Sequence, residues 1–212
     1  MCDWQSWEVP DGIVSTDSSG DATVETTSTV GSCVGLVSPA AYASNVIEAS
    51  IDFPALPSKP NTIANWTTFW LGDLQPGTSP MSGELDAAEV EPNVGFSTVN
   101  YHWGTTAASF RVSTGGGPAG YVLPAEGPNL TPGWHVVDIV YTSGFFAVYY
   151  DGSLYASYKS SVITGDALNI IISSAVTPNT TAIQQALDGP PINSDSSSAT
   201  LVVKYVKIWS YK

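Results

Sequence analysis

The stretch Gly83-Glu84-Leu85-Asp86-Ala87-Ala88-Glu89 places three carboxylates within six residues. The residues between the acids are apolar or small, which is typical of a buried strand rather than of a solvated loop. Only 12% of the 212 residues are charged, so solubility is a poor explanation for three acids here. The alternative explanation is an edge strand that carries charges against aggregation.

The spacing of the acids predicts an irregularity in this strand. Side chains alternate between the two faces of a sheet, so Glu84 and Asp86 share a face and Glu89 points to the opposite one in a regular strand. A β-bulge adds one residue and brings Glu89 back to the shared face. We place the bulge at Ala87-Ala88, because small side chains tolerate the kink. Without it, Glu89 faces the other layer and a joint role for the acids is weakened.

Three carboxylates on one face suggest a chemistry. Glycoside hydrolysis with retention needs two carboxyl groups roughly 5–5.5 Å apart across the glycosidic bond. One attacks as a carboxylate, and the other starts protonated and later acts as a base. A third acid close by helps to separate these roles, because close like charges disfavour joint ionisation and raise one pKa.

The composition of the chain limits the partners and cofactors that we expect. The formal net charge of −13 and the pI near 4.1 argue against nucleic acid and against anionic membrane surfaces as partners. The sequence contains no run of about 18 apolar residues, so it predicts no transmembrane helix. We find no metal-ligand spacing of Cys and His and expect no cofactor. Calcium near Asp17 and Asp21 or near Asp195 is the alternative to plain surface solvation. We expect a secreted, extracellular monomer.

The two cysteines, Cys2 and Cys33, are expected to form one disulfide that fastens the N-terminal segment. Such a bond is worth roughly 3–4 kcal/mol for a loop of that size. Two free thiols are the alternative.

The residue usage predicts an all-β protein. Val, Ile, Thr and aromatic residues are plentiful, and turn residues recur every ten or so positions. Asp151-Gly152 between two aromatic-rich runs predicts a tight hairpin. Segment 15–32 is a weak strand pair or a mobile arm, and a short helix is expected at 181–187. We expect residues 1–212 to form a single domain, an antiparallel β-sandwich. The expected strands are 46–53, 65–71, 84–91, 96–103, 134–142, 145–150, 154–158, 167–174 and 200–210.

Together with its neighbours, the carboxylate strand resembles glycoside hydrolase family 16, the laminarinase and lichenase family. Residues 82–90 match the Glu-x-Asp-x-x-Glu pattern of its bulged branch, preceded by a small residue and Gly. Residues 48–54 are similar to the family's Glu-Ala-Arg-Ile-Lys-x-Pro strand, although the cationic residues are absent. Residues 66–71 match its Trp-x-x-Phe-Trp-Leu block. Residues 134–152 resemble its His-containing strand and Asp-Gly hairpin. The similarity covers about residues 42–175 and the final strand.

This resemblance implies a concanavalin-like jelly roll with a sugar-binding cleft across its concave sheet. It implies a retaining endo-β-glycosidase that hydrolyses a neutral polysaccharide, a β-1,3- or mixed β-1,3/1,4-glucan. Glu84 would be the nucleophile and Glu89 the general acid/base, with Asp86 tuning their protonation. A galactan hydrolase, a transglycosylase of the same fold and a non-catalytic carbohydrate-binding module are the alternatives.

Aromatic residues flank the carboxylate strand in sequence. Sugar binding needs flat apolar faces and hydrogen-bonding edges. The candidates for substrate binding are Trp66, Trp70, His102 and Trp103. Trp66 and Trp70 share a sheet face if their strand is regular, and a place in the core is the alternative for each. His135 is expected to be structural.

Overall fold

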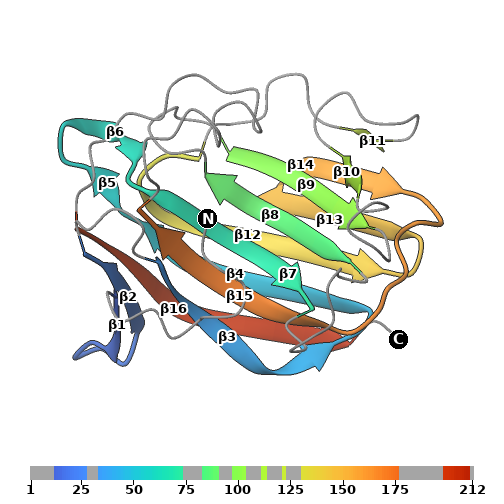
Figure 1. The fold of residues 1–212 in the computed structure, drawn as a ribbon, viewed down its shortest axis with the longest axis horizontal. Coiled ribbons are helices and arrows are strands. Elements are labelled where there is room, and N and C mark those ends of the chain that lie inside the picture. Colours follow the sequence, from blue (N-terminus) through green and yellow to red (C-terminus); the bar gives the residue numbers. More distant parts are fainter. Residues whose placement is uncertain are drawn as a thin grey trace.

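The computed structural model describes residues 12–27, 33–73, 83–90, 97–103, 111–113, 121–122, 130–176 and 198–210. Within these ranges the regular elements are β-strands, and every strand pair is antiparallel. The strands form two large sheets stacked one in front of the other (Figure 1). The predicted antiparallel β-sandwich is therefore confirmed. Among the described residues, no helix has the length and hydropathy needed to span a membrane.

The first sheet, at the back in Figure 1, has eight strands in the described ranges. They are β1 (Gly12–Thr16), β2 (Ala22–Thr26), β4 (Asn45–Phe53), β11 (Tyr121–Val122), β12 (Gly133–Thr142), β13 (Phe145–Tyr150), β14 (Ser153–Lys159) and β16 (Ala199–Ser210). Their spatial order is β1-β2-β16-β4-β12-β13-β14-β11.

The second sheet, in front, has six strands in the described ranges. They are β3 (Cys33–Tyr42), β7 (Trp66–Gly72), β8 (Glu84–Val90), β9 (Ser97–Trp103), β10 (Arg111–Ser113) and β15 (Leu168–Ala175). Their order is β10-β9-β8-β7-β15-β3, so the carboxylate strand β8 is hydrogen-bonded on both sides. A small hairpin pairs β5 (Ala55–Leu56) with β6 (Lys59–Ile63). Because β8 is central, the edge-strand explanation for its three acids is wrong.

The core lies between the two sheets and follows the period of two that strands impose. On β12, Val137, Ile139 and Tyr141 are at most 1% exposed, whereas the residues between them are only partly buried. Fully burying one such side chain contributes about 1.5–3 kcal/mol. The largest fully buried side chains are Tyr101, Tyr141, Phe53, Phe69, Phe146, Ile47, Ile51, Leu56, Ile63, Leu71, Leu85 and Ile139.

All nine predicted strands are present, and their ends agree with the prediction to within one residue. The pairing of β1 with β2 confirms the strand-pair alternative for the N-terminal segment. Strand β3 was not predicted, because it is a sheet edge with a partly exposed second half and a proline, Pro39, in its interior. Edge strands tolerate proline and need no continuous apolar pattern. The helix expected at 181–187 lies outside the described residues.

Local contacts explain two polar sequence features. Asp17 accepts backbone hydrogen bonds from Ser19 (2.7 Å) and Asp21 (3.0 Å), so its carboxylate closes the turn between β1 and β2. Asp195, the other acid considered for calcium, lies outside the described residues. At the predicted hairpin, Asp151 and Gly152 both have positive φ angles, 48° and 75°. Such angles are what a tight turn of the I′ type requires.

His135 supports that hairpin, as expected for a structural residue. Its Nδ1 lies 2.7 Å from Asp151 Oδ2, and its Nε2 lies 2.9 Å from the carbonyl oxygen of Thr131. The other carboxylate oxygen of Asp151 accepts a hydrogen bond from the backbone of Val136. The imidazole therefore links the start of β12 to the β13–β14 turn.

The outer face of β12 gives a prediction on stability. Asp138 pairs in register with Glu48 on one side and Tyr149 on the other. Burial raises the pKa of Asp138, and the nearby Glu48 raises it further. Its ionised form therefore opposes folding at neutral pH, and the penalty is relieved as the pH falls through the raised pKa. We expect Asp138→Asn to increase the free energy of unfolding by about 0.5 kcal/mol at pH 7, because the carboxyl is still partly solvated.

Urea denaturation at pH 7 and at pH 4 measures this effect, and the gain should shrink at the lower pH. Glu48→Gln is the matched control. Lys207 lies 3.0 Å from Glu48 and lowers its pKa, so the control should have the opposite sign at pH 7. A destabilised Asp138→Asn protein at neutral pH would contradict the argument.

Candidate active site

The register of β8 shows the predicted bulge. Against β7, Asp86 pairs with Trp70 and Ala88 pairs with Phe69, so β8 advances by two residues where β7 advances by one. Against β9, the register also shifts between Asp86 and Glu89. Ala87 has no partner in either register. The extra residue therefore lies at Ala87-Ala88, as predicted.

The bulge brings the three acids to one face. On β7, the residues opposite Glu84, Asp86 and Glu89 are Gly72, Trp70 and Thr68, which alternate along the strand. On β9, their partners are His102, Asn100 and Thr98, which alternate in the same way. The registers on both sides agree that all three acids share the face that carries Trp70.

The opposite face of β8 belongs to the core. Leu85, Ala88 and Val90 are at most 2% exposed and lie in the main hydrophobic cluster. In a regular strand, the Glu89 carboxylate would face this apolar layer, where an uncompensated charge is strongly unfavourable. The bulge thus separates charge from core as well as grouping the acids.

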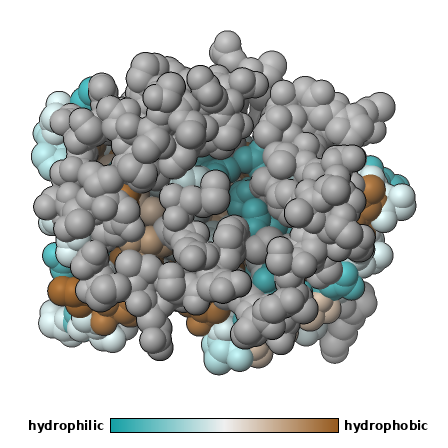
Figure 2. Space-filling model, viewed as in Figure 1, coloured by the Kyte–Doolittle hydropathy of each residue, from teal (hydrophilic) through white to brown (hydrophobic). Residues whose placement is uncertain are grey.

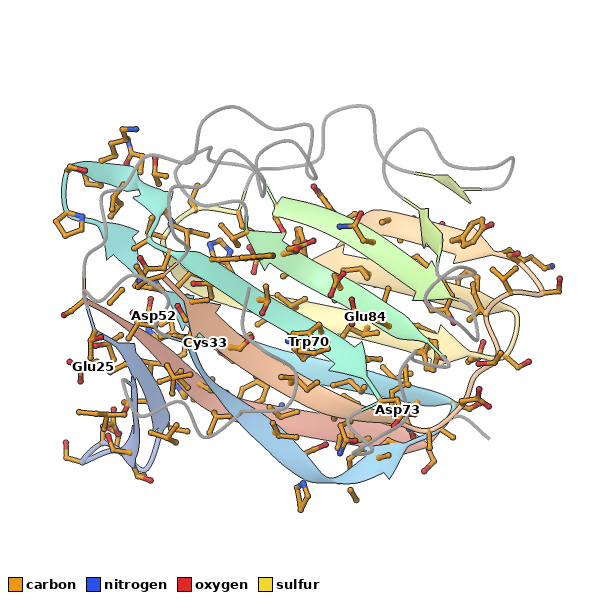
Figure 3. All side chains as sticks on the ribbon, in the orientation of Figure 1. Glu25, Cys33, Asp52, Trp70, Asp73 and Glu84 are labelled. Carbon is orange, nitrogen blue, oxygen red and sulfur yellow. The ribbon has the colours of Figure 1, made fainter. Side chains whose placement is uncertain are left out.

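The three acids are buried although they face away from the core. Glu84 and Asp86 are 7% exposed, and Glu89 is 8% exposed. Figure 3 shows Glu84 and Trp70 on neighbouring strands in the middle of the front sheet. Burying close carboxylates costs free energy, and such clusters concentrate at functional sites. This face of β8 is therefore the candidate active site.

Asn100 fixes the orientation of one acid. Its Nδ2 donates a hydrogen bond of 2.7 Å to Glu89 Oε2. Asn100 is 7% exposed and lies on β9, opposite Asp86. It was not among the predicted site residues. The signal that finds it is its position two residues before His102, which places both on the same face of β9.

Trp70 lies on the same face and is held by its neighbours. Its Nε1 donates to Ser173 Oγ at 3.3 Å, and Ser173 Oγ lies 2.6 Å from Thr68 Oγ1. A Cβ atom built on Gly72 would lie 2.5 Å from the Trp70 ring. The indole therefore lies over Gly72, and the glycine makes room for it. Only 5% of Trp70 is exposed, so the ring is part of the floor of this face.

The other predicted binding residues are described less fully. Trp66 shares the face of Trp70, because β7 pairs regularly with β15. It is partly buried, and among the described residues its Nε1 has no hydrogen-bond partner. His102 pairs in register with Glu84, and Trp103 pairs with Arg111. The side chains of His102 and Trp103 lie outside what the structure describes.

The surface of the front sheet is polar at its centre. In the space-filling view, hydrophilic residues are visible over the region of β8 and β9 (Figure 2).

At the beginning of β3, Cys33 is disulfide-bonded. Its predicted partner, Cys2, lies outside the described residues, so the pairing stays a prediction.

Comparison with solved structures finds the same architecture in β-glucan hydrolases. A glycoside hydrolase family 16 endo-glucanase from Bacteroides ovatus superposes with a TM-score of 0.62 at 16% identity, covering 93% of this chain and 85% of that one. The laminarinase catalytic domain from Thermotoga maritima gives 0.62 at 13% identity, covering 96% and 81%. The β-glucanase of Bacillus licheniformis gives 0.63 at 13% identity, covering 94% and 82%.

No family model matches the sequence, and no curated protein matches it. The likeness to solved structures therefore establishes the fold, which is the jelly roll of family 16 β-glucanases. It confirms the predicted resemblance at that level. The class defined by the fold and the site is a jelly-roll sandwich with three buried carboxylates on the central strand of one sheet.

Proposed function

We propose that this protein is a retaining endo-β-glycosidase that hydrolyses a neutral β-glucan with β-1,3 or mixed β-1,3/1,4 linkages. The observation that carries the proposal is the bulge at Ala87-Ala88, which groups Glu84, Asp86 and Glu89 on one buried face. The grouping matches the requirement of retaining glycosidases for two close carboxyl groups.

The reaction proceeds in two displacements. Glu84, as a carboxylate, attacks the anomeric carbon, while Glu89 transfers its proton to the departing glycosidic oxygen. The sugar is then bound covalently to Glu84. In the second step Glu89 takes a proton from water, which attacks the anomeric carbon and releases Glu84 as a carboxylate. Two inversions give net retention, and the carboxyl groups supply the chemistry without a cofactor.

The neighbours of Glu89 and Glu84 support separate roles. Asp86 lies between them on the same face, so it separates the two carboxyl groups along β8. Asn100 holds one oxygen of Glu89 and so limits rotation of that carboxyl. The assignment of Glu84 as nucleophile and Glu89 as acid/base follows the family resemblance.

The proposed substrate follows from the fold and from the floor of the face. The similar solved structures include an endo-glucanase and two laminarinases. Trp70, fixed by Ser173 over Gly72, and Trp66 are the proposed aromatic contacts for sugar rings. We propose that His102 and Trp103 contribute from β9. Since such polymers are found outside cells, we place the protein there, acting as a monomer.

A polysaccharide panel tests this proposal. The protein is incubated with laminarin, lichenan, cellulose and agarose, new reducing ends are measured, and the first anomer formed is identified by NMR. We expect oligosaccharides from laminarin or lichenan, released first as the β-anomer.

Each other outcome points elsewhere. An α-anomer as first product would contradict the two-step displacement. Cleavage of agarose alone would indicate the galactan hydrolase. Transfer of sugar between chains with no net gain in reducing ends would indicate a transglycosylase. Binding without turnover across the panel would indicate a carbohydrate-binding module.

A further inference from the structure

A tyrosine of the opposite sheet contacts the bulge from within the core, and a second tyrosine stacks on the first. Tyr150 ends β13, and its hydroxyl donates a hydrogen bond of 2.6 Å to the carbonyl oxygen of Ala87. Tyr155 of β14 stacks on Tyr150, with ring centroids 4.2 Å apart and an interplanar angle of 27°. Tyr150 is 2% exposed and Tyr155 is 8% exposed, so both rings are enclosed between the sheets.

The contact to Ala87 supplies what the bulge removes. Ala87 is fully buried and has no register partner on β7 or β9. An unpaired buried carbonyl is unfavourable, because it loses its hydrogen bonds to water without replacement. The Tyr150 hydroxyl gives this carbonyl a donor from the other layer of the sandwich. The bulge in one sheet thus depends on a side chain of the other.

The same pair also holds the strand beside Glu89. The Tyr155 hydroxyl donates to the carbonyl oxygen of Ser97 at 2.5 Å. Since the Tyr150 proton is directed to Ala87, the Ser97 hydroxyl, 3.0 Å away, donates to the Tyr150 oxygen. Ser97 pairs in register with Val90, the residue after Glu89. Burial raises the pKa of Tyr155, which keeps its hydroxyl protonated and able to donate.

These contacts bracket Glu89. Ala87 lies two residues before it, and Ser97 is paired with the residue after it. Glu84 lies before the bulge, three residues from Ala87 and away from the strand end that Ser97 pairs with. We propose that Tyr150 and Tyr155 are positioning residues that lock the bulge and thereby aim the Glu89 carboxyl, acting specifically on its acid/base role. The acid/base role of Glu89 in this inference rests on the proposed function. The claim that the two tyrosines hold the bulge in place does not depend on that function.

The experiment compares Tyr150→Phe with Tyr158→Phe. The first variant keeps the stacked ring and removes only the hydroxyl. The second removes a hydroxyl from another buried ring, 3% exposed and on the same strand as Tyr155, that packs against Phe146. Tyr158 pairs in register with Phe146, at the opposite end of β13 from Tyr150. Tyr155→Phe serves as a second test variant that loses only the Ser97 contact.

Two substrates separate the acid role from the nucleophile role. An unactivated oligosaccharide needs the Glu89 proton for bond cleavage, whereas a dinitrophenyl glycoside has a leaving group that departs without it. We expect Tyr150→Phe to lower kcat on the unactivated substrate by roughly 10-fold to 100-fold. Formation of the glycosyl-enzyme from the activated substrate should change little, and the basic limb of the pH–rate profile should shift. Tyr158→Phe should show neither effect.

Hydrogen exchange of a peptide covering residues 83–90 gives a readout that needs no activity. We expect faster exchange in Tyr150→Phe than in Tyr158→Phe at equal global stability. Unchanged exchange would overturn the lock. Faster exchange with equal loss on both substrates would overturn the specific action on Glu89. If the wild-type protein hydrolyses nothing, the proposed function fails, and the exchange result still decides whether the tyrosines hold the bulge.

Discussion

Replacing Glu84 by glutamine is expected to lower kcat on the preferred glucan by about 10⁴-fold or more, while the protein stays folded. An amide of the same shape does not attack the anomeric carbon, so the first displacement is lost. Glu84 shares a buried face with two other acids, and removing one charge relieves their repulsion. The melting temperature should therefore be unchanged or higher. Reducing-end assays and thermal denaturation measure the two effects.

Removal of Glu89 should have a different signature. The Glu89→Ala variant is expected to form the glycosyl-enzyme from a dinitrophenyl glycoside, but the hydrolysis of this glycosyl-enzyme should be slow. Added azide should then give a β-glycosyl azide, because it replaces water in the second displacement. With Glu84→Ala, azide replaces the nucleophile and should give the α-product. Identical products from both variants would contradict the assigned roles, and full activity of Glu84→Gln would end the proposal.

Inserting one alanine after Ala88 is expected to remove activity and to destabilise the protein. The insertion shifts the alternation by one residue and turns Glu89 toward the layer of Leu85 and Val90. We expect a loss of ~10⁴-fold in kcat/KM, as for a missing general acid. Leaving a charge in the core should also cost about 3–5 kcal/mol of stability in urea denaturation.

Deleting Ala88 is the matched control. The shortened run Glu-Leu-Asp-Ala-Glu has an acid at every second position, so a regular strand places all three on one face without a bulge. We expect this variant to retain activity within about 10²-fold of the wild type, since only the fine placement of Glu89 changes. A deletion variant as inactive as the insertion variant would show that parity is not what determines the site.

The part of the site that depends on local rules was predictable from the sequence. The parity of Glu84, Asp86 and Glu89 predicted both the bulge and its position, because alternation is a property of one strand. The nine predicted strands were found for the same reason: their apolar patterns report burial on one face. Strand β3 was not predicted, because an edge position imposes little apolar pattern on its sequence.

Contacts between the layers were not predictable in this way. The hydrogen bond from Tyr150 to Ala87 joins residues 63 positions apart and depends on how the two sheets stack. Tyr150 is buried, but the partner of its hydroxyl is a property of the assembled sandwich. Ser173 was missed because a single polar residue on a strand gives no signal without knowledge of its neighbours across the sheet. The position of Asn100 two residues before His102 places it on the same face of β9, but it does not reveal the hydrogen bond to Glu89.

The central position of β8 has a consequence for how the proposed reaction is shared between protein and sugar. The strand is hydrogen-bonded to β7 and β9 along its length, and its irregular residue is held from below. Two carboxyl groups on such a frame have little freedom to follow the reacting carbon as it moves from one bond to the next. In the proposed reaction the sugar ring therefore has to distort: it flattens, and its anomeric carbon moves toward Glu84 while the carboxyl groups stay in place. Contacts to sugars beyond the cleaved bond would supply the energy for that distortion, so we expect long polymers to be better substrates than short ones.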